Sequence, residues 1–405
     1  MENRRISLIS FLVLCLSIMV VPPASAGFDW TGAVSAGGAV GECMAAKVPG
    51  SLLESVRSHG RPERRGDRRK IKHAWRECET LSDAVQALPV YEGPLIDAMA
   101  QFDSGVSIEK RLREGMAEGV VGFVLFVRSF RTVGESEGSG LSLREDFPRR
   151  VALGTPKFFN MRGDLDPYYV DQVIKGIGEH DYRVVGEIMY AHGDKVGGEV
   201  TGSGERYLSP LGPETERLLK GLAPLNVPVQ THWEVYDWER DRPAFEQLYK
   251  RWPDQLFIIP HMAFGSVEQV EDILSSHPNV MMTLSKKERR INFFADKAKE
   301  ARLGASMFRS KEGLKPEWRD LIIRYRDRIL FATDAHKRQR WKTYKELVRT
   351  YRRVLGGLPP DVAEDVAWKN AARVYRFEPS LVISPEEPQT SGPSDSGGGL
   401  EILGF

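Results

Sequence analysis

Between residues 91 and 377, short apolar segments alternate with amphipathic helical segments, and this alternation constrains the fold more than any other feature. Strands that are apolar along nearly their whole length are typical of a parallel sheet buried on both faces. Eight segments have this character: 94–100, 120–127, 150–156, 182–190, 227–234, 255–263, 279–285 and 328–336. The pattern therefore predicts strands that alternate with covering helices.

Eight strand–helix units in about 290 residues match the size of a (β/α)8 TIM barrel, which is the α/β fold that we expect for residues 91–377. An open doubly wound sheet is the alternative. That fold more often has a glycine-rich turn after its first strand. The first strand here runs into "DAMAQFD", which contains no glycine.

Several helices have recognisable starts. Asp166 precedes Pro167 in a cap-and-proline pattern, and Gly212-Pro213 opens another helix. Ser266 with Gln269, and Asp361 with Glu364, have the spacing of capping boxes.

The two ends of the chain differ in composition from its middle. Residues 1–26 combine Arg4 and Arg5, an apolar run over 6–21 and a small-residue Ala24-Ser25-Ala26 site, which predicts a cleaved signal peptide. A membrane anchor is the alternative, but the apolar run is shorter than the ~20 residues that a spanning helix needs. We therefore expect export to the periplasm or the medium. Residues 378–405 are rich in Pro, Ser and Gly and predict a disordered tail.

Residues 27–90 predict a helical N-terminal extension. Its basic stretch, Arg57–Lys72, is expected to be a solvated, flexible linker. Cys43 and Cys78 remain after signal cleavage and are able to pair in an oxidising compartment, while two free thiols are the alternative.

The charge balance bears on partners. The chain has 57 Lys and Arg residues against 56 Asp and Glu residues. A general nucleic-acid binder has a strong basic excess, so this balance argues against that class. The oligomeric state has no signature in the sequence.

Chemically versatile residues follow several of the predicted strands. In a barrel of this kind, catalytic groups gather where the strands end. The fourth strand ends in Glu187 and His192, the fifth in His232 and Glu234, the sixth in His261 and the eighth in Asp334. Taken singly, each histidine is more often a hydrogen-bonded core residue than a ligand. Together, two imidazoles and a carboxylate are the groups that hold a divalent metal or move protons.

The segments "VQTHWE", "IIPHMAFG", "ILFATDAH" and "WKNAARVY" resemble the amidohydrolase-related proteins of the amidohydrolase superfamily, over residues 91–377. The resemblance implies a (β/α)8 barrel and, in most members, a metal-dependent hydrolase. It assigns His232 as a metal ligand, His261 as a second ligand or a group that polarises substrate, and Asp334 as a ligand that activates water.

The first strand departs from the family pattern. Members usually carry His-x-His there, whereas "IDAMAQFD" has Met99 and Gln101 at those positions. Gln101 can coordinate only weakly through its carbonyl oxygen, and Met99 is a poor ligand for zinc. The remaining candidate ligands are His232, Asp334 and Glu187, with His261 as a further one.

Three interpretations of function follow. In the first, a divalent metal, zinc in our expectation, activates water to cleave an amide, ester or lactone, with Asp334 and His261 as catalytic groups. In the second, the same residues act as acid–base groups without metal, as in the metal-free lactonases of the family. In the third, the barrel has lost catalysis and is an exported binding protein.

The substrate is expected to be a small molecule, and an anionic one if basic residues face the barrel mouth. Candidate substrate-binding residues are Arg128, His192, Lys286, Lys287 and Gln101. The segments 128–150 and 286–320 are expected to be long loops that act as lids or specificity elements.

Overall fold

A computed structural model describes residues 29–78, 89–103, 105–128, 133–157, 163–192, 206–285, 307–309, 313–336, 338–378 and 380. The expected signal peptide, all but two residues of the expected tail, and Lys286 and Lys287 lie outside these ranges. The chain divides into two compact units, Met1–Gln86 and Ala87–Phe405, and we describe each by itself. No helix within the described ranges has the length and apolar character needed to cross a bilayer.

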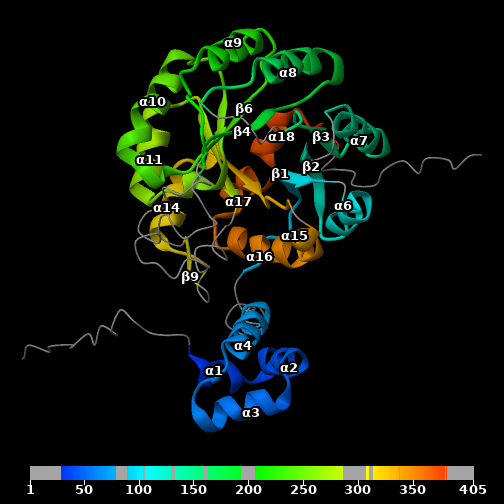
Figure 1. Ribbon diagram of the computed structural model, residues 1–405, viewed down its shortest axis with the longest axis vertical. Helices are drawn as coiled ribbons and strands as arrows, with labels where there is room; N and C mark the ends of the chain where they lie inside the picture. The colour runs from blue at the N-terminus through cyan, green and yellow to red at the C-terminus, as the bar shows by residue number, and fades with distance from the viewer. Residues whose placement is uncertain are drawn as a thin grey trace, which may run out of the picture. The chain divides into compact units, whose positions relative to one another are not determined.

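The larger unit is built on a closed ring of parallel strands (Figure 1). Each of the eight segments expected from the sequence contains one of them: β1 (Leu95–Phe102), β2 (Val120–Val127), β3 (Val151–Leu153), β4 (Val185–His192), β6 (Val229–Trp233), β7 (Phe257–Ile259), β8 (Val280–Ser285) and β11 (Ile329–Ala332). Two sheets, β1-β2-β3 and β11-β8-β7-β6-β4-β5, make up the ring. Parallel bridges between Gly154 and Val184, and between Ala100 and Ala335, join them at both seams. The described residues therefore form a (β/α)8 barrel.

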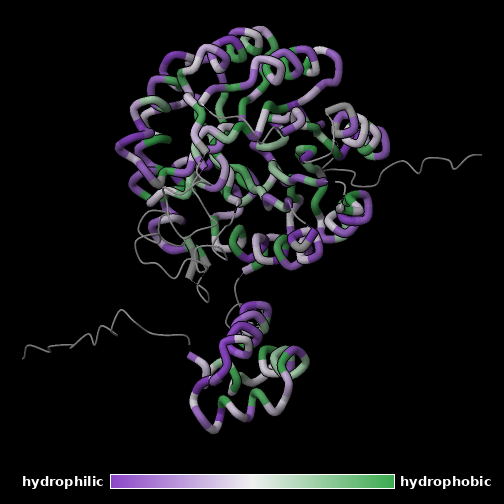
Figure 2. The backbone as a smooth tube through the Cα atoms, in the orientation of Figure 1, coloured by the Kyte–Doolittle hydropathy of each residue, from purple (hydrophilic) through white to green (hydrophobic). Residues whose placement is uncertain are grey.

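Helices follow the strands and surround the ring on its outside (Figure 1). They are α6 (Ile108–Met116), α7 (Val133–Asp146), α8 (Pro167–His180), α9 (Pro213–Leu222), α10 (Trp238–Arg251), α11 (Val267–Ser276), α14 (Pro316–Arg324) and α16 (Tyr344–Gly356). Figure 2 shows apolar strands inside and polar outer helix faces, which is the pattern of a sheet buried on both faces. Short pieces complete the unit: β5 (Arg206–Tyr207), the β9–β10 pair (Phe308–Arg309, Gly313–Leu314) and α15 (Arg338–Lys342).

The barrel interior is a packed core that is separate from the layer between strands and helices. Side chains from several strands fill it, including Ile96, Val124, Ile258 and Leu330, all of them buried. The last helix, α18 (Asn370–Tyr375), follows α17 (Pro360–Glu364) and a π-helical turn, and contributes Tyr375 to this core. Tyr375 also donates to the carbonyl oxygen of Ala98 at 3.4 Å.

Most of the expected helix starts are confirmed. The Asp166 side chain accepts from the backbone of α8, Gly212 precedes α9, and Ser266 and Gln269 form a complete capping box on α11. The box expected at Asp361 and Glu364 is wrong, because α17 already begins at Pro360. Asp361 therefore lies inside the first turn and pairs with an arginine instead.

Two expected irregular or extended segments have a different structure. The segment 128–150 is not one long loop, since α7 occupies Val133–Asp146 and is the helix between β2 and β3. The sixth strand ends at Ile259 rather than at residue 263, because Pro260 begins a tight turn. Residues 261–264 all have positive φ there, between 50° and 63°.

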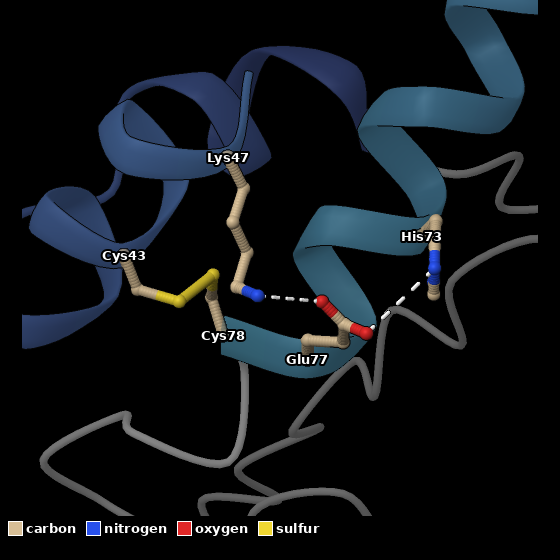
Figure 3. Close-up of a disulfide and its surroundings, with 5 residues drawn as sticks. All are labelled: Cys43, Lys47, His73, Glu77 and Cys78. Carbon is tan, nitrogen blue, oxygen red and sulfur yellow. Dashed lines mark ion pairs between the residues drawn. A yellow bond between two sulfur atoms is a disulfide. The ribbon is translucent and has the colours of Figure 1, made fainter. Parts of the chain in front are cut away.

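The smaller unit is a disulfide-linked group of helices, α1 (Trp30–Val34), α2 (Gly38–Lys47), α3 (Gly50–His59) and α4 (Arg65–Cys78). Cys43 of α2 and Cys78 of α4 form the disulfide (Figure 3), and Lys47 pairs with Glu77 beside it at 2.8 Å. The basic stretch Arg57–Lys72 is not a flexible linker, because its two ends belong to α3 and α4.

Candidate active site

The strand ends bring six polar side chains together at one opening of the barrel. Glu187 and His232 lie on β4 and β6, Gln101 lies on β1, and the other three directly follow strands. None of the six residues is more than 8% exposed. The set is Gln101, Lys157, Glu187, His232, His261 and Asp334. Burying this many polar groups is costly unless they pair with one another or with a cation.

A buried ammonium group organises one side of the site. Lys157 follows β3, and its Nζ donates to Gln101 Oε1 at 2.9 Å and forms an ion pair with Glu187 Oε2. Burial alone would raise the pKa of Glu187, but the charges of Lys157 and His232 outweigh it and hold that pKa well below its usual range. Glu187 is therefore a carboxylate whose charge is balanced from within the protein.

The backbone that presents Glu187 requires a glycine before it. Gly186 has a φ of 116°, and a Cβ at this position would lie 2.6 Å from the carbonyl oxygen of Gln230. Its N–H donates to Thr155 Oγ1 at 3.0 Å. The glycine thus lets β4 approach β6 closely enough for Glu187 to reach His232.

His232 lies between two carboxylates. Its Nδ1 contacts Glu187 Oε1, and its Nε2 lies 2.9 Å from Glu234 Oε1. A neutral imidazole has only one N–H, so both contacts are hydrogen bonds only when the ring is protonated. A cation bound to one of the two nitrogens would satisfy the same arrangement.

His261 faces the same centre from the turn after β7. Its Nδ1 contacts Ser285 Oγ, and its backbone N–H donates to Thr283 Oγ1 at 3.0 Å. Its Nε2 lies 3.8 Å from Glu187 Oε1 and 4.0 Å from Asp334 Oδ2. Four consecutive non-glycine residues with positive φ form this turn, an unfavourable conformation of the kind that concentrates at functional sites.

Asp334 is fixed by contacts on both carboxylate oxygens. Oδ1 accepts from Gln101 Nε2 at 2.9 Å, and Oδ2 accepts from Arg340 of α15 at 2.7 Å. Its backbone N–H donates to the carbonyl oxygen of Met99 at 2.8 Å. These donors hold Asp334 beside His261.

Met99 and Gln101 lie on β1, at the two positions where the resemblance implies histidines. Gln101 bridges Lys157 and Asp334, with its amide oxygen directed at the ammonium group. Met99 packs into the barrel interior. The two positions at which the resemblance implies a metal-binding pair therefore hold a buried methionine and an amide that pairs with Lys157.

Of the other expected substrate-binding residues, two are described by the structure and two are not. Arg128 is half-buried and donates to the carbonyl oxygen of His336 at 3.4 Å. His192 ends β4, and its Nε2 lies 3.8 Å from Glu234 Oε1. Lys286 and Lys287 lie outside the described residues, so their roles stay predictions.

The sequence interpretation assigned no role to three contributors to the site. Lys157 directly follows the third predicted strand, and its position after an apolar run was the available signal. Glu234 lies two residues beyond His232, on the same side of an extended chain. Arg340 had no signal, because it reaches Asp334 from a helix.

Two trios of side chains have atoms close enough to hold a divalent ion. One is Glu187, His232 and His261, and the other is His192, His232 and Glu234; within each trio the ligand atoms lie within 4.8 Å of one another. Both combine imidazoles with one carboxylate, the donors that zinc accepts. The described residues therefore fit a metal ion, and His232 belongs to both trios.

A family model described as amidohydrolase matches residues 185–377, the segment that supplies Glu187, His232, His261 and Asp334. The match spans just under half of the chain, and over these residues the chain is similar to the amidohydrolases. No curated protein matches the chain in sequence.

Several solved structures are similar to this chain at low sequence identity. A probable 2-pyrone-4,6-dicarboxylic acid hydrolase from Acinetobacter baumannii is 12% identical, with 70% of this chain and 99% of that chain covered and a TM-score of 0.45. A putative enzyme of the same description from Pseudomonas putida is 13% identical, with coverage of 70% and 98% and a TM-score of 0.46. A phosphotriesterase homology protein from Escherichia coli is 11% identical, with coverage of 71% and 99% and a TM-score of 0.43.

Proposed function

We propose that this protein is an exported hydrolase that cleaves an amide, ester or lactone bond at the barrel mouth, assisted by one divalent metal ion. The observation that carries the proposal is the convergence of Glu187, His232, His261 and Asp334 at one opening, in a chain that is similar to the amidohydrolases over these residues. A small molecule is the substrate class that such a buried, polar site fits.

The ion would be held by His232 together with the other members of one of the two trios. When bound, it supplies a Lewis acid that acidifies water and polarises a carbonyl oxygen. Both trios offer three ligands, which leaves a fourth position for water or substrate.

Asp334 is the proposed general base. Its carboxylate is held by Gln101 and Arg340 and lies 4.0 Å from His261 Nε2, so both groups point at the same reaction space. Asp334 would take a proton from the attacking water and return it to the leaving group. His261 would donate to the substrate carbonyl oxygen as charge develops on it.

One observation favours a second candidate, a metal-free hydrolase. Glu187 pairs with Lys157, and Asp334 pairs with Arg340, so two of the buried carboxylates already have a cation from the protein. In that case His232, His261 and Asp334 would act as acid–base groups. Arg128 would then help to hold an anionic substrate.

The test combines metal analysis with turnover. Purified protein is analysed for zinc and manganese and assayed on aryl esters, lactones and N-acyl amino acids. We expect about one ion per chain and turnover that Asp334→Asn lowers by roughly 100-fold or more in kcat. Asp320→Asn is the matched control, because Asp320 on α14 has a side chain that is 66% exposed.

Each other outcome has a defined meaning. Lactone turnover without bound metal would support the second candidate. Absence of both metal and turnover would contradict hydrolysis and favour a binding protein that has lost catalysis. An Asp334→Asn variant as active as the wild type would remove Asp334 from the mechanism.

Export is supported by two features. The first 26 residues have the composition of a signal peptide, and Cys43 and Cys78 form a disulfide in the smaller unit. Structural disulfides are typical of proteins in oxidising compartments.

A further inference from the structure

The fifth strand of the barrel carries a His-x-Glu pair at its end. His232 and Glu234 are two residues apart in extended backbone, so their side chains lie on the same side. Glu234 is fully buried, and its Oε1 lies 2.9 Å from His232 Nε2 and 3.8 Å from His192 Nε2. Two imidazole nitrogens and one carboxylate oxygen are donors that a divalent cation accepts.

Lys157 distinguishes the two trios. A divalent ion bound to Glu187 would lie next to the Lys157 ammonium group, which already pairs with the same carboxylate. The positive charges of the ion and of the ammonium group would repel each other strongly when both are buried beside one carboxylate. Glu187, the partner of Lys157, is a member of the first trio and not of the trio of His192, His232 and Glu234.

The orientation of His232 agrees with this distinction. Its Nδ1 is held by Glu187, which leaves Nε2 directed toward Glu234. A metal-binding histidine commonly donates its second ring N–H to a carboxylate, which fixes the ring and makes the ligating nitrogen more basic. Glu187 is placed to do this while its own charge is balanced by Lys157.

We propose, resting on the proposed function, that the metal ion binds to His192, His232 and Glu234 rather than to Glu187 and His261. Tetrahedral zinc with ligand distances of ~2.0–2.1 Å places its ligand atoms about 3.3 Å apart, and the separations of 2.9 and 3.8 Å bracket that value. The first strand has Met99 and Gln101 in place of two histidines, and the proposed ligands come from the ends of the fourth and fifth strands.

The position of His192 suits an ion that enters from solvent. Its side chain is 24% exposed, whereas the side chains of His261 and Glu187 are 1% and 4% exposed. Pairing of His192 with Arg206 of β5 fixes its backbone at the end of β4. The trio is thus held by strand backbone and borders solvent.

The experiment measures Co²⁺ and Zn²⁺ affinity of the full chain, by calorimetry and by competition with a chromophoric chelator, in five proteins. These are the wild type, His192→Ala, Glu234→Gln, His261→Ala and Glu187→Gln, each checked for folding by its thermal transition. We expect His192→Ala and Glu234→Gln to lower affinity by roughly 100-fold or more, and Glu187→Gln by about 10-fold. His261→Ala should bind both ions as the wild type does.

Ester and lactone hydrolysis is followed in the same proteins. Loss of affinity in His261→Ala, with His192→Ala and Glu234→Gln unchanged, would place the ion on the other trio and overturn the inference while the proposed function stands. No binding of Co²⁺ or Zn²⁺ by the wild type would overturn the inference, and turnover would then decide the proposed function separately. If His192→Ala fails to fold, Glu234→Gln alone decides, because it preserves side-chain shape.

Discussion

At the residue scale, the barrel contains an acid that is buried away from the proposed chemistry. Asp97 of β1 is fully buried, and its carboxylate accepts from the Thr333 N–H and hydroxyl at 2.9 and 2.6 Å and from the Tyr344 hydroxyl at 2.8 Å. Burial raises its pKa to about 6, although these hydrogen bonds oppose the shift. Asp97 therefore connects β1 with the residue before Asp334 and with helix α16.

The raised pKa of Asp97 predicts a pH-dependent stability. Folding favours the protonated form of Asp97. The stabilisation that this form contributes to the free energy of unfolding is fully present below pH 4, and it is lost as the pH rises through about 6. We expect the free energy of unfolding of the wild type, relative to Asp97→Asn, to fall by up to ~3 kcal/mol between pH 4 and 7. Urea unfolding of both proteins at several pH values checks this.

Asp320→Asn serves again as a control for the pH dependence of an exposed carboxylate. A constant difference in unfolding free energy between wild type and Asp97→Asn over this pH range would contradict the assignment.

At the scale of secondary-structure elements, the strands were the most predictable part of the chain. Their apolar runs had the right number and order because a sheet buried on both faces leaves few polar positions. The turn after β7 could not be predicted, since residues 261–264 include no glycine to indicate left-handed backbone. The helix start at Pro360 was placed too late because Asp361 and Glu364 imitate a capping box.

The candidate site was predictable only where its residues follow strands directly. His232, His261 and Asp334 were identified in this way, and the structure brings them together. Lys157 lies one residue beyond its predicted strand, and its partner Glu187 is 30 residues away. Which groups pair depends on the closed ring, and a sequence pattern holds no information on that pairing.

The Cys43–Cys78 disulfide joins helices α2 and α4 of the smaller unit. The smaller unit has a small apolar core, and its disulfide closes a loop over a sequence separation of 35 residues. In the chain-entropy model such a loop stabilises by about 3–4 kcal/mol. We expect Cys43→Ser with Cys78→Ser to abolish protection of α2 and α4 from hydrogen exchange while the barrel strands keep theirs.

The matched control for the disulfide is Ser58→Ala on α3, an exposed residue whose hydroxyl bonds only within its own helix in the described contacts. Unchanged exchange of α2 and α4 in the double variant would show that the helices hold together without the disulfide.

At the scale of the whole molecule, the proposed export depends on the N-terminal sequence and on the disulfide of the smaller unit. We expect the full-length chain, expressed in a Gram-negative host, to be recovered outside the cytoplasm without its first ~26 residues and with Cys43 and Cys78 oxidised. Intact-mass measurement of each cell fraction checks both. Full-length, reduced protein confined to the cytoplasm would contradict export.

The buried Lys157 bears on what happens at the barrel opening when a bound metal ion is removed. A chelator removes an ion that is held by side chains, but it has no access to an ammonium group that is part of the chain. Burial lowers the pKa of Lys157 and the charge of Glu187 opposes that shift, and the pair of Lys157 with Glu187 belongs to the chain itself. The Glu187 charge is thus compensated whether or not an ion is bound, so removal of the ion should leave the fold of the barrel intact.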